Sequence, residues 1–216
     1  MKAIKELFNK PKIIGIAANI NQGKSNLIYY LIKTLQEENK FNLYVYGLKN
    51  NVDGAIKINS VAELENIKNS VIIIDEMFSL FDLDQTRIKA QLEKSFRLIN
   101  HNNNILILCG VGENYKKFLS SKLEVVIFKK INFYDLINGS RVKNIALNYK
   151  GPEMGSTLLN LNVNEALVFD GQHYFKIEIP YFKEMDTKLK NINIFQKHNI
   201  TQQQKQKMAQ KSRRKE

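Results

Sequence analysis

Three consecutive residues, Gly23, Lys24 and Ser25, have the side chains that a phosphate-binding loop (P-loop) needs. In such a loop, backbone N–H groups and the positive end of the following helix surround the phosphates, so bulky side chains must stay out of the way. The Lys24 ammonium would reach the β- and γ-phosphates of a nucleotide, and the Ser25 hydroxyl would be a ligand of Mg²⁺. The spacing therefore predicts a site for ATP and Mg²⁺.

The loop departs from the motif Gly-x-x-x-x-Gly-Lys-Ser/Thr at its first position, where Ala18 stands. Ala18 must have a negative φ or bear some strain. We interpret this as a tolerable variant; the alternative is a chance Gly-Lys-Ser in an ordinary loop. The residues predicted to contact the nucleotide are Ala18, Asn19, Ile20, Asn21, Gln22, Gly23, Lys24, Ser25 and Asn26.

Two acidic residues, Asp75 and Glu76, directly follow four β-branched residues at positions 71–74. Such a run predicts a central parallel strand that is buried on both faces. Its carboxylates then emerge at the carboxyl edge of the sheet, where open α/β sheets bind ligands. Asp75 would hold Mg²⁺ through water opposite Ser25. Glu76 would polarise the water that attacks the γ-phosphate, and Lys24, at the phosphates, would be a second catalytic residue. The alternative is a pair of surface acids at a strand end.

Strands and helices that alternate along the chain would position these residues. Strands are predicted over residues 13–17, 41–48, 71–76, 104–110 and 123–130. Helices are predicted over residues 1–11, after the P-loop, from Ser60 to near Asn69, and over residues 84–101. The helix at Ser60 would begin with a capping box that pairs this residue with Glu63. This alternation predicts a parallel sheet with helices on both faces.

The pattern changes after Ile131 to strand-like segments and turns. Residues 142–150 and 165–182 are strand-like, residues 151–156 are interpreted as a turn, and Asp170-Gly171 predicts a hairpin turn. We expect these segments to extend the far edge of the sheet. The fold class predicted from the residues is thus α/β, with a mostly parallel sheet.

The composition of the 216-residue chain suits one α/β domain. No long apolar window and no signal-peptide pattern occur, so an intracellular protein that does not span a membrane is expected. Histidines and the single cysteine lack the spacing of a zinc site. The single cysteine, Cys109, ends an apolar run and is predicted to be a buried, inert thiol.

The net charge of +12 favours a polyanionic partner such as nucleic acid or an acidic membrane surface. Six basic residues and one acid lie between Thr201 and Glu216, which predicts a cationic, disordered tail. A merely solubilising terminus is the alternative. We expect an N-terminal helix at residues 1–11, an ATPase domain at 12–182 and a basic tail at 183–216.

The P-loop, the intervening strand and the paired acids Asp75 and Glu76 resemble those of P-loop ATPases with a catalytic glutamate. Residues 11–180 are similar to the FtsK/HerA group, especially the genome-packaging ATPases of tailless viruses and the zonula-occludens-toxin-like proteins of filamentous phages. The resemblance implies a RecA-like sheet of strand order 5-1-4-3-2, a homo-hexameric ring and ATP-driven movement of double-stranded DNA. It departs from the group at the end of the fourth strand, where Cys109 and Gly110 replace a polar sensor, for which Glu113 or Asn114 would have to substitute.

Ring ATPases of this kind complete each site with an arginine from the neighbouring subunit, which offsets charge on the γ-phosphate. The candidates for this arginine are Arg97 and Arg87, on the predicted helix at 84–101, and Arg141. Arg97 is preferred to Arg87. For each of them, a solvated surface charge is the alternative. Lysines at residues 49–57 and 116–122 are candidates for a channel that grips DNA without reading its sequence.

The function predicted from these features is an ATP-driven double-stranded DNA translocase for viral genome packaging. It would work in the cytoplasm of the host cell, or be incorporated in the virion, with a capsid or membrane partner. The alternative is an assembly factor of the zonula-occludens-toxin-like kind that uses ATP as a switch. A small-molecule kinase would need a lid with clustered arginines after the second strand, and residues 50–60 contain no arginine.

Overall fold

A computed structural model describes residues 2–19, 21–38, 40–48, 52–75, 86–111, 122–132 and 151–182. The helices and strands below lie in one compact unit, Met1–Pro180. The predicted tail at 183–216 and the strand-like residues 142–150 lie outside the described residues.

The centre of the molecule is an eight-stranded sheet of order β3-β2-β4-β5-β1-β6-β7-β8. Its strands are β1 (Lys12–Ala18), β2 (Asn42–Tyr46), β3 (Ala55–Lys57), β4 (Ser70–Ile74), β5 (Ile105–Val111), β6 (Val125–Phe128), β7 (Glu165–Phe169) and β8 (Tyr174–Glu178). Neighbours from β3 to β6 pair in parallel, whereas β6–β7 and β7–β8 pair antiparallel. The mostly parallel sheet and the Asp170-Gly171 hairpin are therefore confirmed.

The five strands predicted at the core of the sheet are β1, β2, β4, β5 and β6, and they lie in the predicted order 5-1-4-3-2. The difference is an extra edge strand, β3, which pairs with β2. It occupies a polar stretch between the predicted strand at 41–48 and the predicted helix at Ser60, where no strand was predicted. With three residues that are half-buried or exposed, β3 has too little apolar alternation to be recognised from sequence.

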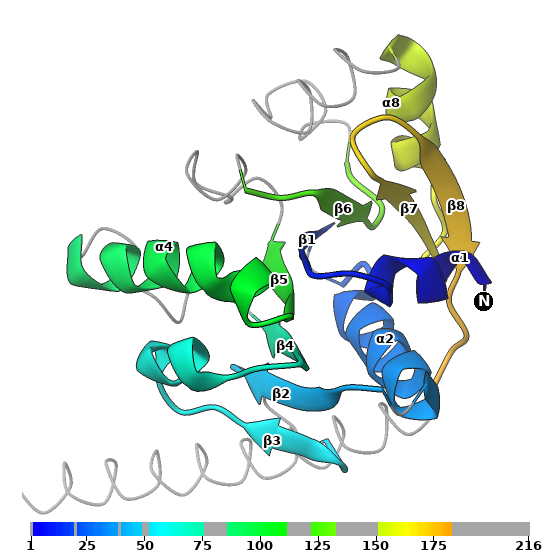
Figure 1. The fold of residues 1–216 in the computed structure, drawn as a ribbon. Helices are drawn as coiled ribbons and strands as arrows, with labels where there is room; N and C mark the ends of the chain where they lie inside the picture. Colours follow the sequence, from blue (N-terminus) through cyan, green and yellow to red (C-terminus); the bar gives the residue numbers. More distant parts are fainter. Residues whose placement is uncertain are drawn as a thin grey trace, which may run out of the picture. The chain divides into compact units, whose positions relative to one another are not determined.

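Helices lie on both faces of this sheet. Helix α2 (Lys24–Glu38) and helix α4 (Thr86–His101) are on opposite faces, and α1 (Lys2–Lys5) lies beside α2 (Figure 1). The 3-10 helices are η1 (Glu6–Phe8) and η2 (Val61–Asn66). The cap of η2 differs slightly from the predicted capping box, because the Ser60 hydroxyl accepts from Ala62 N and the Glu63 carboxylate from Asn59 N.

The two faces of β4 have different neighbours. Ile72 and Ile74 belong to a core cluster that also contains Leu92 and Phe96 of α4. Because successive side chains of a strand point to opposite faces, Ile73 and the next odd-numbered residue, Asp75, point toward the face of α2. This parity brings the strand-end carboxylate to the side of the sheet where the P-loop helix begins.

One prediction near the C-terminal edge is wrong. Residues 151–156 are not a turn but the start of helix α8 (Gly151–Asn160). Pro152 stands in the first turn, where a missing N–H is tolerated, and Glu153 there favours the helix dipole. Met154 and Leu158 are fully buried one helical turn apart, which outweighs the two glycines.

Candidate nucleotide-binding site

The P-loop connects the end of β1 to the start of α2. Among its described residues, Asn21 and Gly23 have positive φ values of 63° and 78°. Gln22 N donates to Asn19 O at 3.3 Å, and the first turn of α2 closes with Leu27 N donating to Gly23 O at 3.0 Å. Backbone that changes handedness in this way, followed by a helix N-terminus, makes a concave ring of N–H groups suited to phosphate.

Ala18 does not have the left-handed backbone conformation found in this loop. It is the last residue of β1, it is buried, and it is not among the described non-glycine residues with positive φ. The left-handed conformation falls instead on Asn21, a residue type that tolerates it. Of the two alternatives stated for Ala18, a negative φ or some strain, the structure therefore has the first.

Lys24 and Asp75 form an ion pair, with the ammonium Nζ 2.6 Å from Oδ1. The two side chains are only 13% and 12% exposed. Lys24 opens α2, whereas Asp75 follows β4, which is separated from β1 by β5 in the sheet. The two predicted motifs therefore meet at one edge of the sheet.

The backbone fixes the position of Asp75. Its N–H donates to the carbonyl oxygen of Tyr46 at the end of β2, at 2.9 Å, so the parallel ladder between these strands continues one residue past β4. A buried carboxylate held in this way has little freedom to leave the site.

The donor atoms at this site fit Mg²⁺ and a nucleotide. The Ser25 hydroxyl and the Asp75 carboxylate offer hard oxygen ligands, which Mg²⁺ prefers, and Ser25 is exposed. Asn26 Nδ2, in the first turn of α2, donates to Pro180 O at 2.8 Å. The side-chain oxygen of Gln22 is buried and has no hydrogen-bond partner among the described residues, so it is an acceptor that a bound ligand could satisfy.

Cys109 lies at the place where a polar sensor was expected. Its side chain is fully buried, and burial followed by the nearby Asp75 carboxylate raises the pKa of the thiol well above its usual value. A thiol with a raised pKa stays protonated and is a poor nucleophile. The prediction of a buried thiol is confirmed, and Glu113 and Asn114 lie outside the described residues.

Several predicted residues lie outside the described part of the chain or only partly within it. Ile20, Glu76, Arg141 and the side chain of Arg87 lie outside what the structure describes. Arg97 is exposed on α4 and lines a cavity of about 260 Å³ with Glu93, Phe96 and Lys122. Among described residues it forms no hydrogen bond or ion pair with Lys24 or Asp75.

Sequence reasoning missed Lys129, which directly follows β6. Its side chain is fully buried, and its backbone N–H donates to Ala17 O at 2.9 Å, one residue before the end of β1. The only signal in the sequence is a lysine at the end of an apolar strand, which is common at sheet edges.

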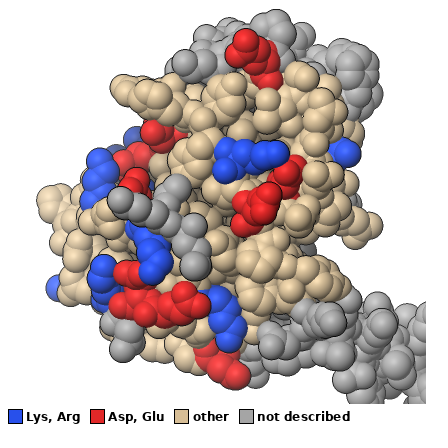
Figure 2. All heavy atoms as spheres, turned by 90° about the vertical axis from the view of Figure 1, so that its right-hand side faces the viewer, with Lys and Arg blue, Asp and Glu red and all other residues tan. Residues whose placement is uncertain are grey.

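Charges on one face of the molecule are mixed. Figure 2 shows basic and acidic side chains interspersed on that face, without a continuous basic patch. The six basic residues after Thr201 lie outside the described residues. In the described part of the chain, no helix has the length and apolar character needed to span a membrane.

Neither models of known protein families nor curated protein sequences match the chain. Solved structures do. The genome packaging NTPase B204 from Sulfolobus turreted icosahedral virus 2, in complex with sulfate, is 16% identical, with a TM-score of 0.61 over 80% of this chain and 98% of that one. B204 in complex with ATP-gammaS is 17% identical, with a TM-score of 0.59 over 81% and 100%.

B204 from Sulfolobus turreted icosahedral virus, described as a DNA-packaging ATPase, is 17% identical, with a TM-score of 0.60 over 80% of this chain and 100% of that one. These similarities show a shared fold. The chain has the P-loop NTPase fold, which confirms the predicted fold class and, at the level of the fold, the resemblance to genome-packaging ATPases.

Proposed function

We propose that this protein is an ATPase of the FtsK/HerA type that moves double-stranded DNA into a viral capsid. The observation that carries the proposal is the ion pair between Lys24 of the P-loop and Asp75 at the end of β4. It brings two separately predicted parts of a nucleotide site together within a P-loop NTPase fold. The solved neighbours described as packaging ATPases support the DNA-directed part of the proposal.

Each residue has a distinct role in this proposal. Backbone N–H groups of residues 18–26 hold the phosphates, and Lys24 places a positive charge on the β- and γ-phosphates. Ser25 and Asp75 hold Mg²⁺, which neutralises charge that develops on the phosphate oxygens. Glu76, next to the positioned Asp75, orients and deprotonates the attacking water.

The same hypothesis assigns roles to the arginines, the ring and the basic tail. Arg97 or Arg87 of a neighbouring subunit completes each site of a homo-hexameric ring, which explains why Arg97 needs no contact with its own Lys24 or Asp75. Residues 1–11 and 12–182 form the helix and ATPase domain, and residues 183–216 form a basic tail that adds non-specific contacts to DNA phosphates. The protein works in the cytoplasm of the host cell.

ATP hydrolysis by the purified protein tests this function. Turnover is measured with and without double-stranded DNA, at low and moderate salt, for the native protein and for Glu76→Gln. Glu178→Gln on the exposed surface of β8 is the matched control. We expect DNA to raise turnover several-fold, more at low salt, and Glu76→Gln to lower it by at least about a hundredfold while Glu178→Gln does not.

Two other results are informative. If ATP binds but hydrolysis is absent or indifferent to DNA, the translocase proposal is wrong and the nucleotide-switch alternative replaces it. If neither ATP nor ATPγS binds, the nucleotide site itself is wrongly assigned.

A further inference from the structure

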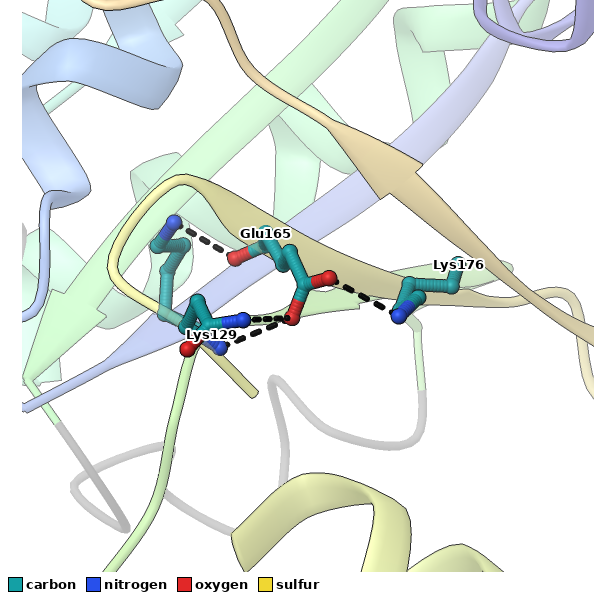
Figure 3. A network of polar contacts seen from close by, with 4 residues as sticks. Lys129, Glu165 and Lys176 are labelled. Carbon is teal, nitrogen blue, oxygen red and sulfur yellow. Dashed lines mark hydrogen bonds and ion pairs between the residues drawn. The ribbon is translucent and has the colours of Figure 1, made fainter. Parts of the chain in front are cut away.

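Lys129 is a lysine whose entire side chain is buried, with 0% exposed. Its ammonium donates to the backbone carbonyl oxygen of Glu165 at 2.6 Å (Figure 3). It also donates to the backbone carbonyl oxygen of Val163, again at 2.6 Å. Among the described residues no carboxylate lies within ion-pair distance of it. A buried charge held by carbonyl groups alone is expensive, so its presence calls for a reason.

The two carbonyls belong to one tight turn, residues 162–165, which joins α8 to β7. Glu165 N donates to Asn162 O at 3.0 Å, and the Glu165 carboxylate accepts from Asn162 N and Nδ2 at 2.8 Å and 3.1 Å. The other carboxylate oxygen accepts from Lys176 Nζ of β8 at 2.8 Å (Figure 3). Lys129 on one side and Glu165 on the other therefore hold this turn in one conformation.

This turn lies next to Gly23 of the P-loop. A Cβ atom added to Gly23 would lie 2.9 Å from the carbonyl oxygen of Val163, 3.3 Å from its Cγ1 and 3.5 Å from Cε of Lys129. Val163 and the lysine stem thus form a wall against the residue that precedes Lys24. Because Lys129 N also donates to Ala17 O, the same lysine is bonded to the strand end before the loop and has its side chain beside Gly23 at the end of the loop.

Packing alone does not account for a lysine here. An apolar side chain of similar volume would fill the same space without the cost of burying a charge. What the ammonium adds is two directed hydrogen bonds to Val163 and Glu165, which fix the distance between the turn and β6. A phosphate site depends on such positioning, since small displacements of its N–H groups weaken binding.

We propose that Lys129 is a positioning residue of the nucleotide site, which holds the turn at 162–165 against Gly23 and thereby keeps the P-loop in its phosphate-binding shape. The effect on nucleotide affinity rests on the proposed ATPase function, whereas the effect on the loop does not. The C-terminal hairpin β7–β8 is then mechanically connected to the P-loop through Glu165 and Lys176.

The test compares Lys129→Met with Lys130→Met, which removes the same charge from the next residue. Hydrogen–deuterium exchange of the apo protein reports on amides of residues 18–26, with the amides of α4 as an internal reference. Calorimetric titration with Mg²⁺ and ATPγS gives the affinity. We expect Lys129→Met to speed exchange in the loop but not in α4 and to weaken ATPγS binding by about tenfold or more, with kcat at saturating ATP little changed.

Unchanged loop exchange in a folded Lys129→Met protein overturns the proposal, as does faster exchange that is equal throughout the chain. If Lys129→Met does not fold, Glu165→Gln decides, because it weakens the same turn while keeping an acceptor for Asn162; loop exchange must then rise above that of Lys130→Met. If the native protein binds no ATPγS, the proposed function fails, and the exchange comparison still decides the role of Lys129.

Discussion

The ammonium of Lys24 lies 2.6 Å from Oδ1 of Asp75, and both side chains are nearly buried. In this arrangement the two groups that should serve a nucleotide and its metal neutralise each other. Phosphates must then compete with Asp75 for Lys24, and the metal must compete with Lys24 for Asp75. We therefore expect the binding of nucleotide and of Mg²⁺ to be mutually dependent. Phosphate that binds Lys24 releases Asp75 for the metal, and metal that binds Asp75 releases Lys24 for the phosphate.

Asp75→Asn tests this competition. Without the carboxylate, Lys24 has no anionic partner among the described residues, so ATPγS should bind in the absence of Mg²⁺ about tenfold more tightly than to the native protein. The same variant should lose the gain in affinity that Mg²⁺ gives, and should lose turnover. Calorimetric titrations with EDTA and with Mg²⁺ measure both effects.

Asp53→Asn is the control, because this exposed turn residue can be replaced by asparagine without changing the turn chemistry. Weaker metal-free binding in Asp75→Asn would contradict the competition between Asp75 and phosphate.

Gly23→Ala should be much more harmful than Gly171→Ala, although both glycines have positive φ, +78° and +93°. Nothing lies within 4 Å of a Cβ at Gly171, so alanine there should cost only the left-handed strain, about 1–2 kcal/mol. At Gly23 the same strain adds to a 2.9 Å approach to Val163 O, and we expect about 3 kcal/mol or more. Urea unfolding of the two variants measures the difference in stability. Equal losses in the free energy of unfolding would show that Val163 moves away from the added Cβ atom at little cost.

The stability of the protein should depend on Lys129 in a definite direction with pH. Burial lowers the pKa of the Lys129 ammonium from 10.5 to about 8, and the nearby Glu165, itself paired with Lys176, only partly opposes this. Between about pH 8 and pH 10.5 the unfolded chain then binds a proton that the folded chain does not, so unfolding becomes harder as pH rises.

Urea unfolding of the native protein and Lys129→Met at several pH values from 7 to 10 checks this sign. We expect the stability of the native protein relative to Lys129→Met to increase through that range. A difference that stays constant or shrinks would contradict the lowered pKa, because titration of all other groups is common to both proteins.

The sequence was sufficient to predict the meeting of the P-loop and Asp75. In an α/β chain, a continuous apolar run such as residues 71–74 predicts a strand that is buried on both faces. The acid that follows such a strand must emerge at the carboxyl edge of the sheet. The helix of the P-loop, α2, begins at that same edge. Proximity of Lys24 and Asp75 then follows from topology, without knowledge of any individual contact.

Features that depend on tertiary contacts were not predictable in this way. Helix α8 begins with glycine and proline, so its local signal resembles a turn, and burial of Met154 and Leu158 stabilises it as a helix. Lys129 looks like an ordinary strand-end lysine until the turn at 162–165, more than thirty residues away in sequence, supplies its two acceptors. Positive φ at Asn21 likewise depends on where the loop must point.

Displacement of a triplex-forming oligonucleotide from a linear DNA duplex tests most directly whether the protein moves along double-stranded DNA. A translocase that moves along the duplex strips the third strand without unwinding the other two. We predict displacement that requires ATP, fails with ATPγS in place of ATP, and is lost in Lys24→Ala but retained in Glu178→Gln. DNA-stimulated hydrolysis without any displacement would contradict the translocase account and leave ATP as a switch for assembly.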